Sequence, residues 1–247
     1  MRKLILYLFL FFTVSVQGQE QTAKKGDFYE NVKVNIDADL EEWGDLLIPA
    51  DEDSSWSYAV AFDNEYLYIA MELQNVFLQQ EAVRTGIFIN INGENKTQEG
   101  ATLFFPVPDR ELAKEYLEEN KESSQDVRGA LLGLVRGYRV RGFERLPDGL
   151  ISLQNTYGLN AEVRLTEDEL LHYEARIPLS AIHIKTENKA VAVQVGVNTQ
   201  WVQMQRLRNT KRGNAWSPNR NMQTIKNPYD FENFVWLRGE LKEDIDN

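Results

Sequence analysis

WSYAVAFDNEYLYIAMEL, residues 56–73, contains two alternating runs of side chains on either side of a short polar turn. Large apolar residues, many of them aromatic or β-branched, fill every second position, which is typical of strands with one buried face. Asp63-Asn64-Glu65 between the runs suits a tight turn. The stretch therefore predicts an antiparallel β-hairpin. Its expected inward faces carry Trp56, Tyr58, Val60, Phe62, Leu67, Ile69 and Met71.

Most of the remaining chain predicts further short strands. The expected strands are residues 32–36, 86–92, 101–107, 130–140, 149–158, 161–165, 172–179, 191–204 and 234–241. The stretch PDRELAKEYLEENKE (108–122) differs, because Pro108 and Asp109 precede apolar residues at helical spacing. We expect one short inserted helix near 109–122. Many short strands with one helix predict an all-β antiparallel β-sandwich, in a single domain over residues 31–241.

The first eighteen residues have the plan of a secretory signal peptide. Arg2 and Lys3 precede an apolar run at 4–16, and Val16-Gln17-Gly18 supplies small residues for cleavage. The run is shorter than the roughly 20 apolar residues of a membrane-spanning helix, although a retained anchor is the alternative. We expect cleavage after residue 18, no transmembrane span in the mature chain, and a secreted or periplasmic protein. A polar linker at 19–30 and an acidic tail at 242–247 flank the domain.

Composition excludes several classes of protein. The chain has no Cys, so thiol catalysis, disulfides and Cys-based zinc sites are ruled out, as is a lipoprotein anchor. A chain of this length buries enough apolar surface to fold without disulfides. Asp and Glu outnumber Lys and Arg by 38 to 27, a net charge of −11 that argues against nucleic acid as a partner.

VNIDADLEEWGD (34–45) resembles the opening of the family 9 carbohydrate-binding modules and their DOMON-like relatives, a strand ending Ile-Asp-Gly and an acidic stretch closed by Trp. Ala38 replaces the usual Gly, so the turn must avoid a positive φ or tolerate strain. Four further stretches resemble later signatures of the family, in the same order along the chain. They are residues 61–73, YEARIPLSAI (173–182), WSPN (216–219) and FENFVWL (231–237). The resemblance implies a DOMON-like sandwich with immunoglobulin-like packing of two sheets, and a structural role for Trp43. It also implies a non-catalytic module that binds carbohydrate, although one fold hosts many functions.

Catalytic residues are scarce. His172 and His183 are the two histidines, and no Gly-x-Ser-x-Gly motif accompanies them. Acids are abundant, but the sequence isolates no pair of them in an aromatic groove, as a glycosidase requires. We therefore expect no enzyme, and a polysaccharide-active enzyme is the least supported alternative.

Two cofactors have candidate ligands. The acidic turn at 37–45 makes Asp37 and Asp39 candidate ligands of a structural calcium ion, because Ca²⁺ prefers oxygen ligands. The acidic spacing is not that of a defined calcium loop, so a solvated turn is the alternative. Haem in DOMON-like cytochromes is held by a Met and a His, but soft ligands alone define no site. We expect no haem and no other cofactor. The methionines available to such a site are Met71, Met204 and Met222.

Candidate ligand-binding residues lie toward the C-terminus. Trp56, Trp201 and Trp216 have polar neighbours, as a sugar-stacking ring would, although a buried indole also needs a polar partner. Residues 188–229 contain seven Lys or Arg and no Asp or Glu. Because Arg pairs well with carboxylates, this segment suits an acidic glycan, although composition alone favours a solvated or structural charge run. The predicted binding residues are Trp201, Trp216, Arg206, Arg208, Arg212, Asn214 and Arg220. A structural or protein-interaction domain of the cell envelope is the alternative function.

Overall fold

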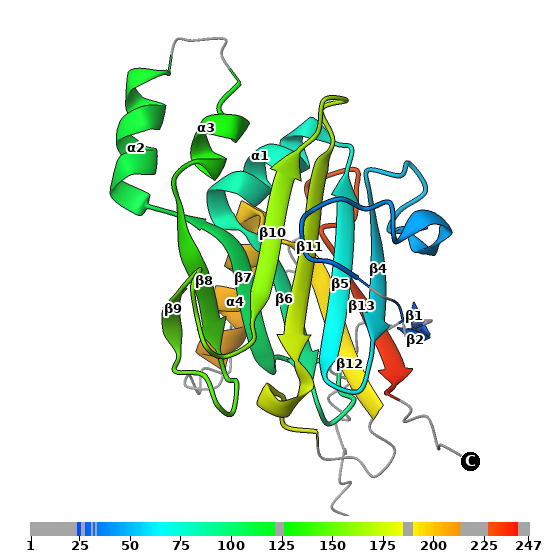
Figure 1. Ribbon diagram of the computed structural model, residues 1–247. Helices are drawn as coiled ribbons and strands as arrows, with labels where there is room; N and C mark the ends of the chain where they lie inside the picture. Colours follow the sequence, from blue (N-terminus) through cyan, green and yellow to red (C-terminus); the bar gives the residue numbers. More distant parts are fainter. Residues whose placement is uncertain are drawn as a thin grey trace, which may run out of the picture.

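The computed structural model is a two-layer β-sandwich with helices at one end and on one outer face (Figure 1). It describes residues 24–25, 28–30, 32, 34–121, 126–184, 190–212 and 227–241, with only the backbone of 24, 25 and 208–212. The predicted signal peptide and acidic tail lie outside the described residues. No described helix is long and apolar enough to cross a membrane.

The first sheet has seven strands in the order β1-β13-β12-β6-β7-β8-β9. Its neighbours pair antiparallel, except for the parallel pair β1–β13. The strands are β1 (Lys24–Lys25), β6 (Ile87–Asn92), β7 (Ala101–Pro108), β8 (Val135–Arg141), β9 (Gly149–Ser152), β12 (Ala190–Val197) and β13 (Phe234–Glu240).

The second sheet has the order β10-β11-β5-β4-β2, with β3 also paired to β4. The predicted hairpin is confirmed, because Val60 pairs with Ile69 and Phe62 with Leu67 across the Asp63–Glu65 turn. Only β2 runs parallel to its neighbour in this sheet. The strands are β2 (Tyr29–Glu30), β3 (Ile48–Pro49), β4 (Trp56–Phe62), β5 (Tyr66–Leu73), β10 (Asn160–Leu165) and β11 (Leu171–Pro178).

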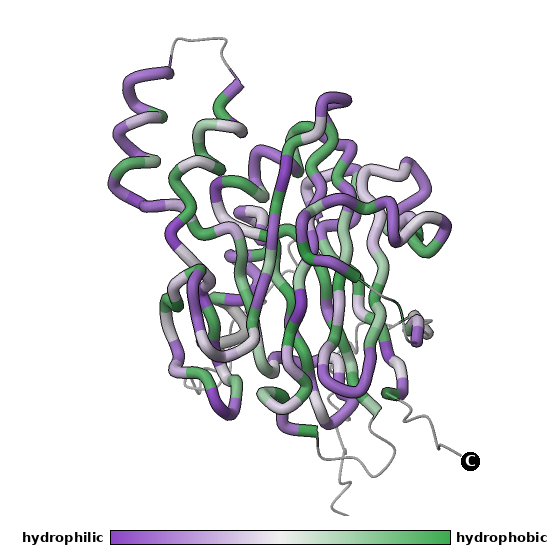
Figure 2. Tube along the Cα trace, in the orientation of Figure 1, coloured by the Kyte–Doolittle hydropathy of each residue, from purple (hydrophilic) through white to green (hydrophobic). Residues whose placement is uncertain are grey.

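The main core lies between the two sheets, where alternate side chains of each strand meet. Hydrophobic residues follow the strands in Figure 2, whereas the turns and α2 are largely hydrophilic. A second, smaller cluster lies on the outer face of the second sheet, beneath the segment 34–47. It centres on Trp43, which is fully buried. The fold class predicted from the alternating runs, an all-β sandwich, is confirmed.

The prediction of a single helix is wrong. The predicted helix is α2 (Arg110–Glu119), capped by Asp109. The structure adds α1 (Val76–Thr85), α3 (Arg128–Leu132) and α4 (Gln200–Arg212), with the short 3-10 helices η1 (Gly44–Leu46) and η2 (Leu179–Ala181). The predicted strands 130–140 and 191–204 are therefore shorter, since α3 takes the start of one and α4 the end of the other. Strand 149–158 likewise ends at Ser152.

Local capping explains two of these differences. Asn75 begins α1, and its side chain accepts hydrogen bonds from the backbone N–H groups of Phe77 and Leu78. Thr199 precedes α4 and accepts the N–H of Val202 at 3.4 Å through its hydroxyl.

The predicted strand 32–36 is also wrong, because its described residues are not in a strand and a two-residue β2 precedes them.

Candidate binding surface

One carboxylate of the second sheet forms hydrogen bonds with the segment 34–47, which covers the outer face of that sheet. Glu174 of β11 is fully buried and accepts the indole N–H of Trp43 at 2.6 Å. It also accepts the backbone N–H groups of Asp37 and Ala38, at 3.0 and 2.7 Å. Burial raises the pKa of this carboxyl, and the three hydrogen bonds oppose that rise. Trp43 is therefore structural, as the family resemblance implied.

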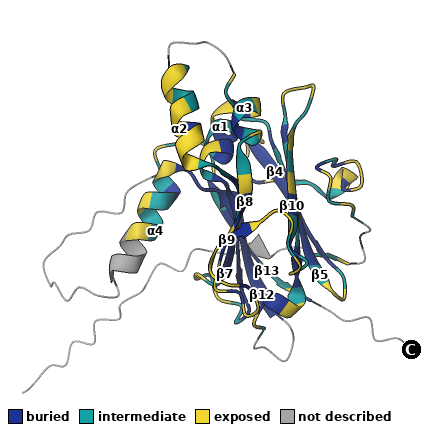
Figure 3. Ribbon diagram, turned by 60° about the vertical axis from the view of Figure 1, so that its left-hand side comes forward, coloured by how far each residue is buried: buried dark blue, intermediate teal, exposed yellow. Residues whose placement is uncertain are grey.

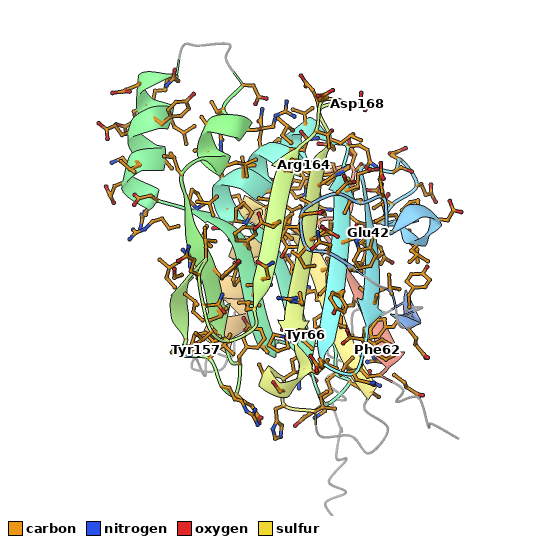
Figure 4. All side chains as sticks on the ribbon, viewed as in Figure 1. Glu42, Phe62, Tyr66, Tyr157, Arg164 and Asp168 are labelled. Carbon is orange, nitrogen blue, oxygen red and sulfur yellow. The ribbon has the colours of Figure 1, made fainter. Side chains whose placement is uncertain are left out.

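The two predicted calcium ligands lie in this turn. Asp37 accepts the N–H of Asp39 at 2.9 Å and the side-chain amide of Asn35 at 2.7 Å. Asp39 lies 3.6 Å from the guanidinium of Arg164, which Figure 4 labels near the upper end of β10. Within the described ranges, no three His, Asp or Glu side chains are grouped as metal ligands. A calcium site at Asp37 and Asp39 stays a prediction.

Helix α4 lies against the outer face of the first sheet (Figure 3). The ring of Trp201 stacks on Phe234 of β13, with centroids 6.2 Å apart and planes at 16°. The guanidinium carbon of Arg206 lies 3.9 Å from the ring centroid of Phe88 and 5.0 Å from that of Phe104. Burial lowers the pKa of Arg206 to about 10, while the charge of Glu99 opposes the change. Both side chains thus pack α4 onto the sheet.

The other predicted ligand-binding residues are only partly placed. The backbones of Arg208 and Arg212 belong to α4, so this part of the expected cationic loop is helical. Asn214, Trp216 and Arg220 lie outside the described residues. Trp56 is buried, and its indole N–H donates to the carbonyl oxygen of Glu232 at 2.7 Å.

A group of three aromatic rings, one exposed and two half-buried, lies at the end of the sandwich where α1 begins. Phe77 of α1 is 42% exposed, and its ring centroid lies 5.2 Å from Tyr229 and 6.2 Å from Phe231. Tyr229 and Phe231 stack on each other at 5.1 Å with planes only 3° apart. We call Phe77, Tyr229 and Phe231 the aromatic shelf. Sequence reasoning missed it, because about 150 residues of chain separate Phe77 from the other two rings.

Hydrogen bonds hold the loop that carries the aromatic shelf. The side chain of Asn227 accepts the N–H of Tyr229 at 3.1 Å and donates to the carbonyl oxygen of Phe231 at 2.8 Å. Glu232 is held through its carbonyl by Trp56, and its N–H donates to Asp51 at 3.3 Å. Because these hydrogen bonds already hold the backbone of the loop, it loses little conformational entropy when it binds a ligand.

The surroundings of the aromatic shelf are polar and mostly acidic. Burial raises the pKa of the Tyr229 phenol, and the nearby charge of Glu81 adds to the rise. Glu81 also accepts the N–H of Gln200 at 3.2 Å, which joins α1 to the start of α4 beside Trp201. Asp230 is exposed within the loop. The shelf therefore combines apolar ring surface with hydrogen-bonding side chains, the usual make-up of a small-ligand site.

The residues considered for catalysis and haem are dispersed. His172 lies 3.2 Å from Glu72 across β11 and β5, and His183 contacts Glu144 near η2. Met71 is buried in the core and Met204 is exposed on α4, while Met222 lies outside the described residues. The hydrogen bonds described for the two histidines are with carboxylates and not with a serine hydroxyl, as a nucleophile and base would need.

A cavity of about 440 Å³ opens at the C-terminal end of β6, beside Asn92 and Gly93. Its walls are the β6–β7 loop, the end of β8 and the segment after η2. The lining residues include Ile91, Asn92, Glu94, Glu99, Arg141 and His183. It shares no residue with the aromatic shelf.

No protein-family model matches the chain, and no curated protein matches it. The fold is similar to that of a family 9 carbohydrate-binding module from Caldicellulosiruptor kristjanssonii, solved in complex with glucose and in complex with cellotriose. The glucose complex is 12% identical and has a TM-score of 0.34 over 70% of this chain and 78% of that one. The cellotriose complex is 13% identical, with a TM-score of 0.33 over 70% and 77%. This is the family whose sequence signatures the chain resembles, but so distant a likeness assigns no ligand to it.

Proposed function

We propose that this protein is a non-catalytic module that binds carbohydrate through the aromatic shelf. The observation that carries the proposal is the contact of the exposed ring of Phe77 with the half-buried rings of Tyr229 and Phe231. The apolar C–H face of a sugar ring stacks on such surfaces, while nearby polar side chains reach its hydroxyl groups. Glu81, whose charge acts on Tyr229, and the exposed Asp230 are candidate polar groups for that purpose.

The rigidity of the loop supports this proposal. Asn227 sets the separation of Tyr229 and Phe231 before any ligand arrives, because it bonds the backbone of both. The hydrogen bond from Trp56 then ties the loop to β4. A surface already in its binding geometry spends little of the interaction energy on ordering side chains.

Secretion is part of the proposal. Residues 1–18 would be removed on export, so the mature protein would begin at Gln19 and act in the periplasm, at the cell surface or in the medium. The mass of the protein purified from the exporting cell tests this directly. A mature protein that retains residues 1–18 would contradict cleavage and favour the anchored alternative.

Isothermal titration against neutral oligosaccharides and against uronic-acid oligosaccharides tests the binding function. We expect Phe77→Ala and Tyr229→Ala each to weaken binding by about tenfold, since aromatic contacts are worth roughly 1 kcal/mol or more. Leu112→Ala is the matched control, because Leu112 is an exposed apolar residue on α2. Absence of binding to any sugar, or equal weakening in the control, would defeat the proposal.

The cationic segment is a second arm of the same titration. If Arg208, Arg212, Asn214, Trp216 and Arg220 bind an acidic glycan, uronic-acid oligosaccharides will bind in a salt-dependent way. Arg212→Ala together with Arg220→Ala would then weaken their binding and leave neutral sugars unaffected. Trp201 and Arg206, which complete the predicted site, pack on the first sheet, so substituting them also tests folding.

A structural or interaction domain of the envelope is the second candidate function. It is favoured by the burial of Trp43, Trp56 and Trp236, which leaves fewer indole rings for a ligand. Iodide quenching of Trp fluorescence tests whether a sugar covers Trp201 or Trp216, since the aromatic shelf contains no Trp. Strong quenching with no relief by any sugar, together with no heat of binding in the titration, favours the interaction domain.

A further inference from the structure

We propose that the cavity at the far end of β6 is a second binding site, and that it takes a neutral polyhydroxylated ligand the size of a mono- or disaccharide. The aromatic shelf is built from the start of α1 and the loop before β13, whereas the cavity lies where β6 ends, at Asn92 and Gly93. The two share no residue, and this inference does not require the shelf to bind.

The floor of the cavity is apolar and belongs to the core. Ile91, Ala101 and Ile182 line it, and all three are buried. Their strands and η2 bring them together from both sheets. The volume of about 440 Å³ falls within the range of about 300–1,000 Å³ typical of small-ligand pockets.

The rim of the cavity offers hydrogen-bond acceptors and donors together. Glu94 and Glu99 bring carboxylates to it, and Arg141 and His183 bring nitrogen groups, although Glu94 also bonds Lys96 and His183 also contacts Glu144. The guanidinium of Arg141 lies 3.7 Å from Glu99, and both side chains are at least half exposed. Exposed ion pairs of this length are worth little, so a ligand can replace them at small cost.

The walls of the cavity are rigid. Asn92 accepts the N–H groups of Glu94 and Lys96 at 3.0 and 3.1 Å, which fixes the turn after β6. Gly93 lies so close to the chain at His183 that a Cβ atom would come within 1.8 Å of its carbonyl oxygen. Glycine therefore lets the two walls meet, and the cavity exists before any ligand binds.

The balance of charges on the rim selects the class of ligand. An anion would face Glu94 and Glu99, and a cation would face Arg141, so either would leave a charge opposed. A hydroxyl group both donates and accepts, and it can therefore pair with either kind of side chain. The C–H surface of a sugar ring suits the apolar floor. A neutral polyol satisfies all three conditions.

Chemical-shift titration of the ¹⁵N-labelled mature chain tests this inference. The probes are glucose, cellobiose, glucuronate and glycine betaine, which represent a neutral sugar, its dimer, an anion and a zwitterion. We expect a neutral sugar to shift the amide signals of Gly93, Gly100 and Gly142, which line the cavity. Arg141→Ala and Glu99→Ala should each weaken this binding by about tenfold.

Two controls make the outcomes distinct. Arg139→Ala removes an exposed arginine from the same strand, outside the cavity, and should leave the binding unchanged. Phe77→Ala should abolish shifts at the aromatic shelf and leave those at the cavity. Chemical-shift changes confined to the shelf would contradict a binding site in the cavity and would leave the proposed function unaffected. Chemical-shift changes confined to the cavity would support this inference and would contradict sugar binding at the shelf. Preference for glucuronate or betaine at the cavity, or no shift there, would overturn it.

Discussion

Trp43 and Glu174 are joined by a hydrogen bond of 2.6 Å although 131 residues separate them in the chain. The same carboxylate holds the backbone of Asp37 and Ala38. Two of the sequence signatures of the resemblance, the acidic turn closed by Trp and the Tyr-Glu pair of β11, thus meet at one carboxylate. The opening segment therefore covers the second sheet through one buried polar contact as well as through apolar packing.

Removal of either partner should cost stability, with coupling between the two. We expect Trp43→Phe and Glu174→Gln each to lower the free energy of unfolding by about 1–3 kcal/mol, because each leaves a buried hydrogen-bonding group without its partner. The double variant should cost less than the sum of the two, by about 1 kcal/mol. Urea unfolding measures all three. Trp201→Phe is the control, since the indole N–H of Trp201 has no hydrogen-bond partner in the described chain. Additive losses would contradict the coupling.

The stability of the protein should fall as Glu174 ionises. Burial raises the folded-state pKa of this carboxyl above its ordinary value of 4.5, so the folded protein holds the proton more tightly than the unfolded chain. This contribution to the free energy of unfolding is complete below pH 4.5 and is lost as pH rises through the folded pKa. The stability of the wild type relative to Glu174→Gln should therefore decrease as the pH rises above 4.5. Parallel curves, or a relative gain for the wild type with rising pH, would contradict this.

Ala38→Gly should stabilise the protein. Ala38 has a φ of 59°, in the left-handed region that costs a residue with a Cβ atom roughly 1–2 kcal/mol. Part of that gain is offset by the added freedom of glycine in the unfolded chain, so we expect a net rise of about 0.5–1 kcal/mol in thermal or urea unfolding. The same change at Ala113, inside α2, should instead lower stability by about 1 kcal/mol. Similar losses at both positions would show that the turn is unstrained.

Arg206 should stabilise the packing of α4. Arg206→Met keeps the aliphatic length but removes the cation above Phe88 and Phe104, and we expect a loss of about 0.5–2 kcal/mol in the free energy of unfolding. The neighbouring change Leu207→Ala should have little effect, because Leu207 is exposed. If stability is unchanged while binding of uronic-acid sugars is lost, Arg206 is a ligand-binding residue and its packing role is refuted.

The strands could be predicted where the alternation of apolar and polar residues fits a strand and no other element. In the hairpin at 56–73, the pattern of buried aromatic and β-branched residues defines both faces, and the register follows from the short turn. α2 was also predictable, because Asp109 and a periodic apolar stripe mark it locally. These signals lie within a few residues of each other in the chain.

α4 and the aromatic shelf depend on contacts that no local pattern contains. QWVQMQ continues the apolar and polar alternation of β12, so the expected strand ran on to Met204, while the helix is held by Phe88, Phe104 and Phe234 on the sheet. The shelf needs α1 and the loop before β13 to meet, and the sequence gives no sign of that meeting. The only local hint was Asn75, a helix-capping residue just before Phe77.

The parallel pairing of β1 with β13 decides how the molecule can be attached to a support. Lys24 pairs with Leu237 and both strands run the same way, so β1 begins on the side where β13 begins, whereas residue 241 follows the end of β13. The shelf lies before the start of β13, so the seven residues of that strand, about 20 Å, separate it from residue 241. Immobilisation through a tag after residue 241 would thus present the shelf to the solution, which suits surface-based measurements of sugar binding.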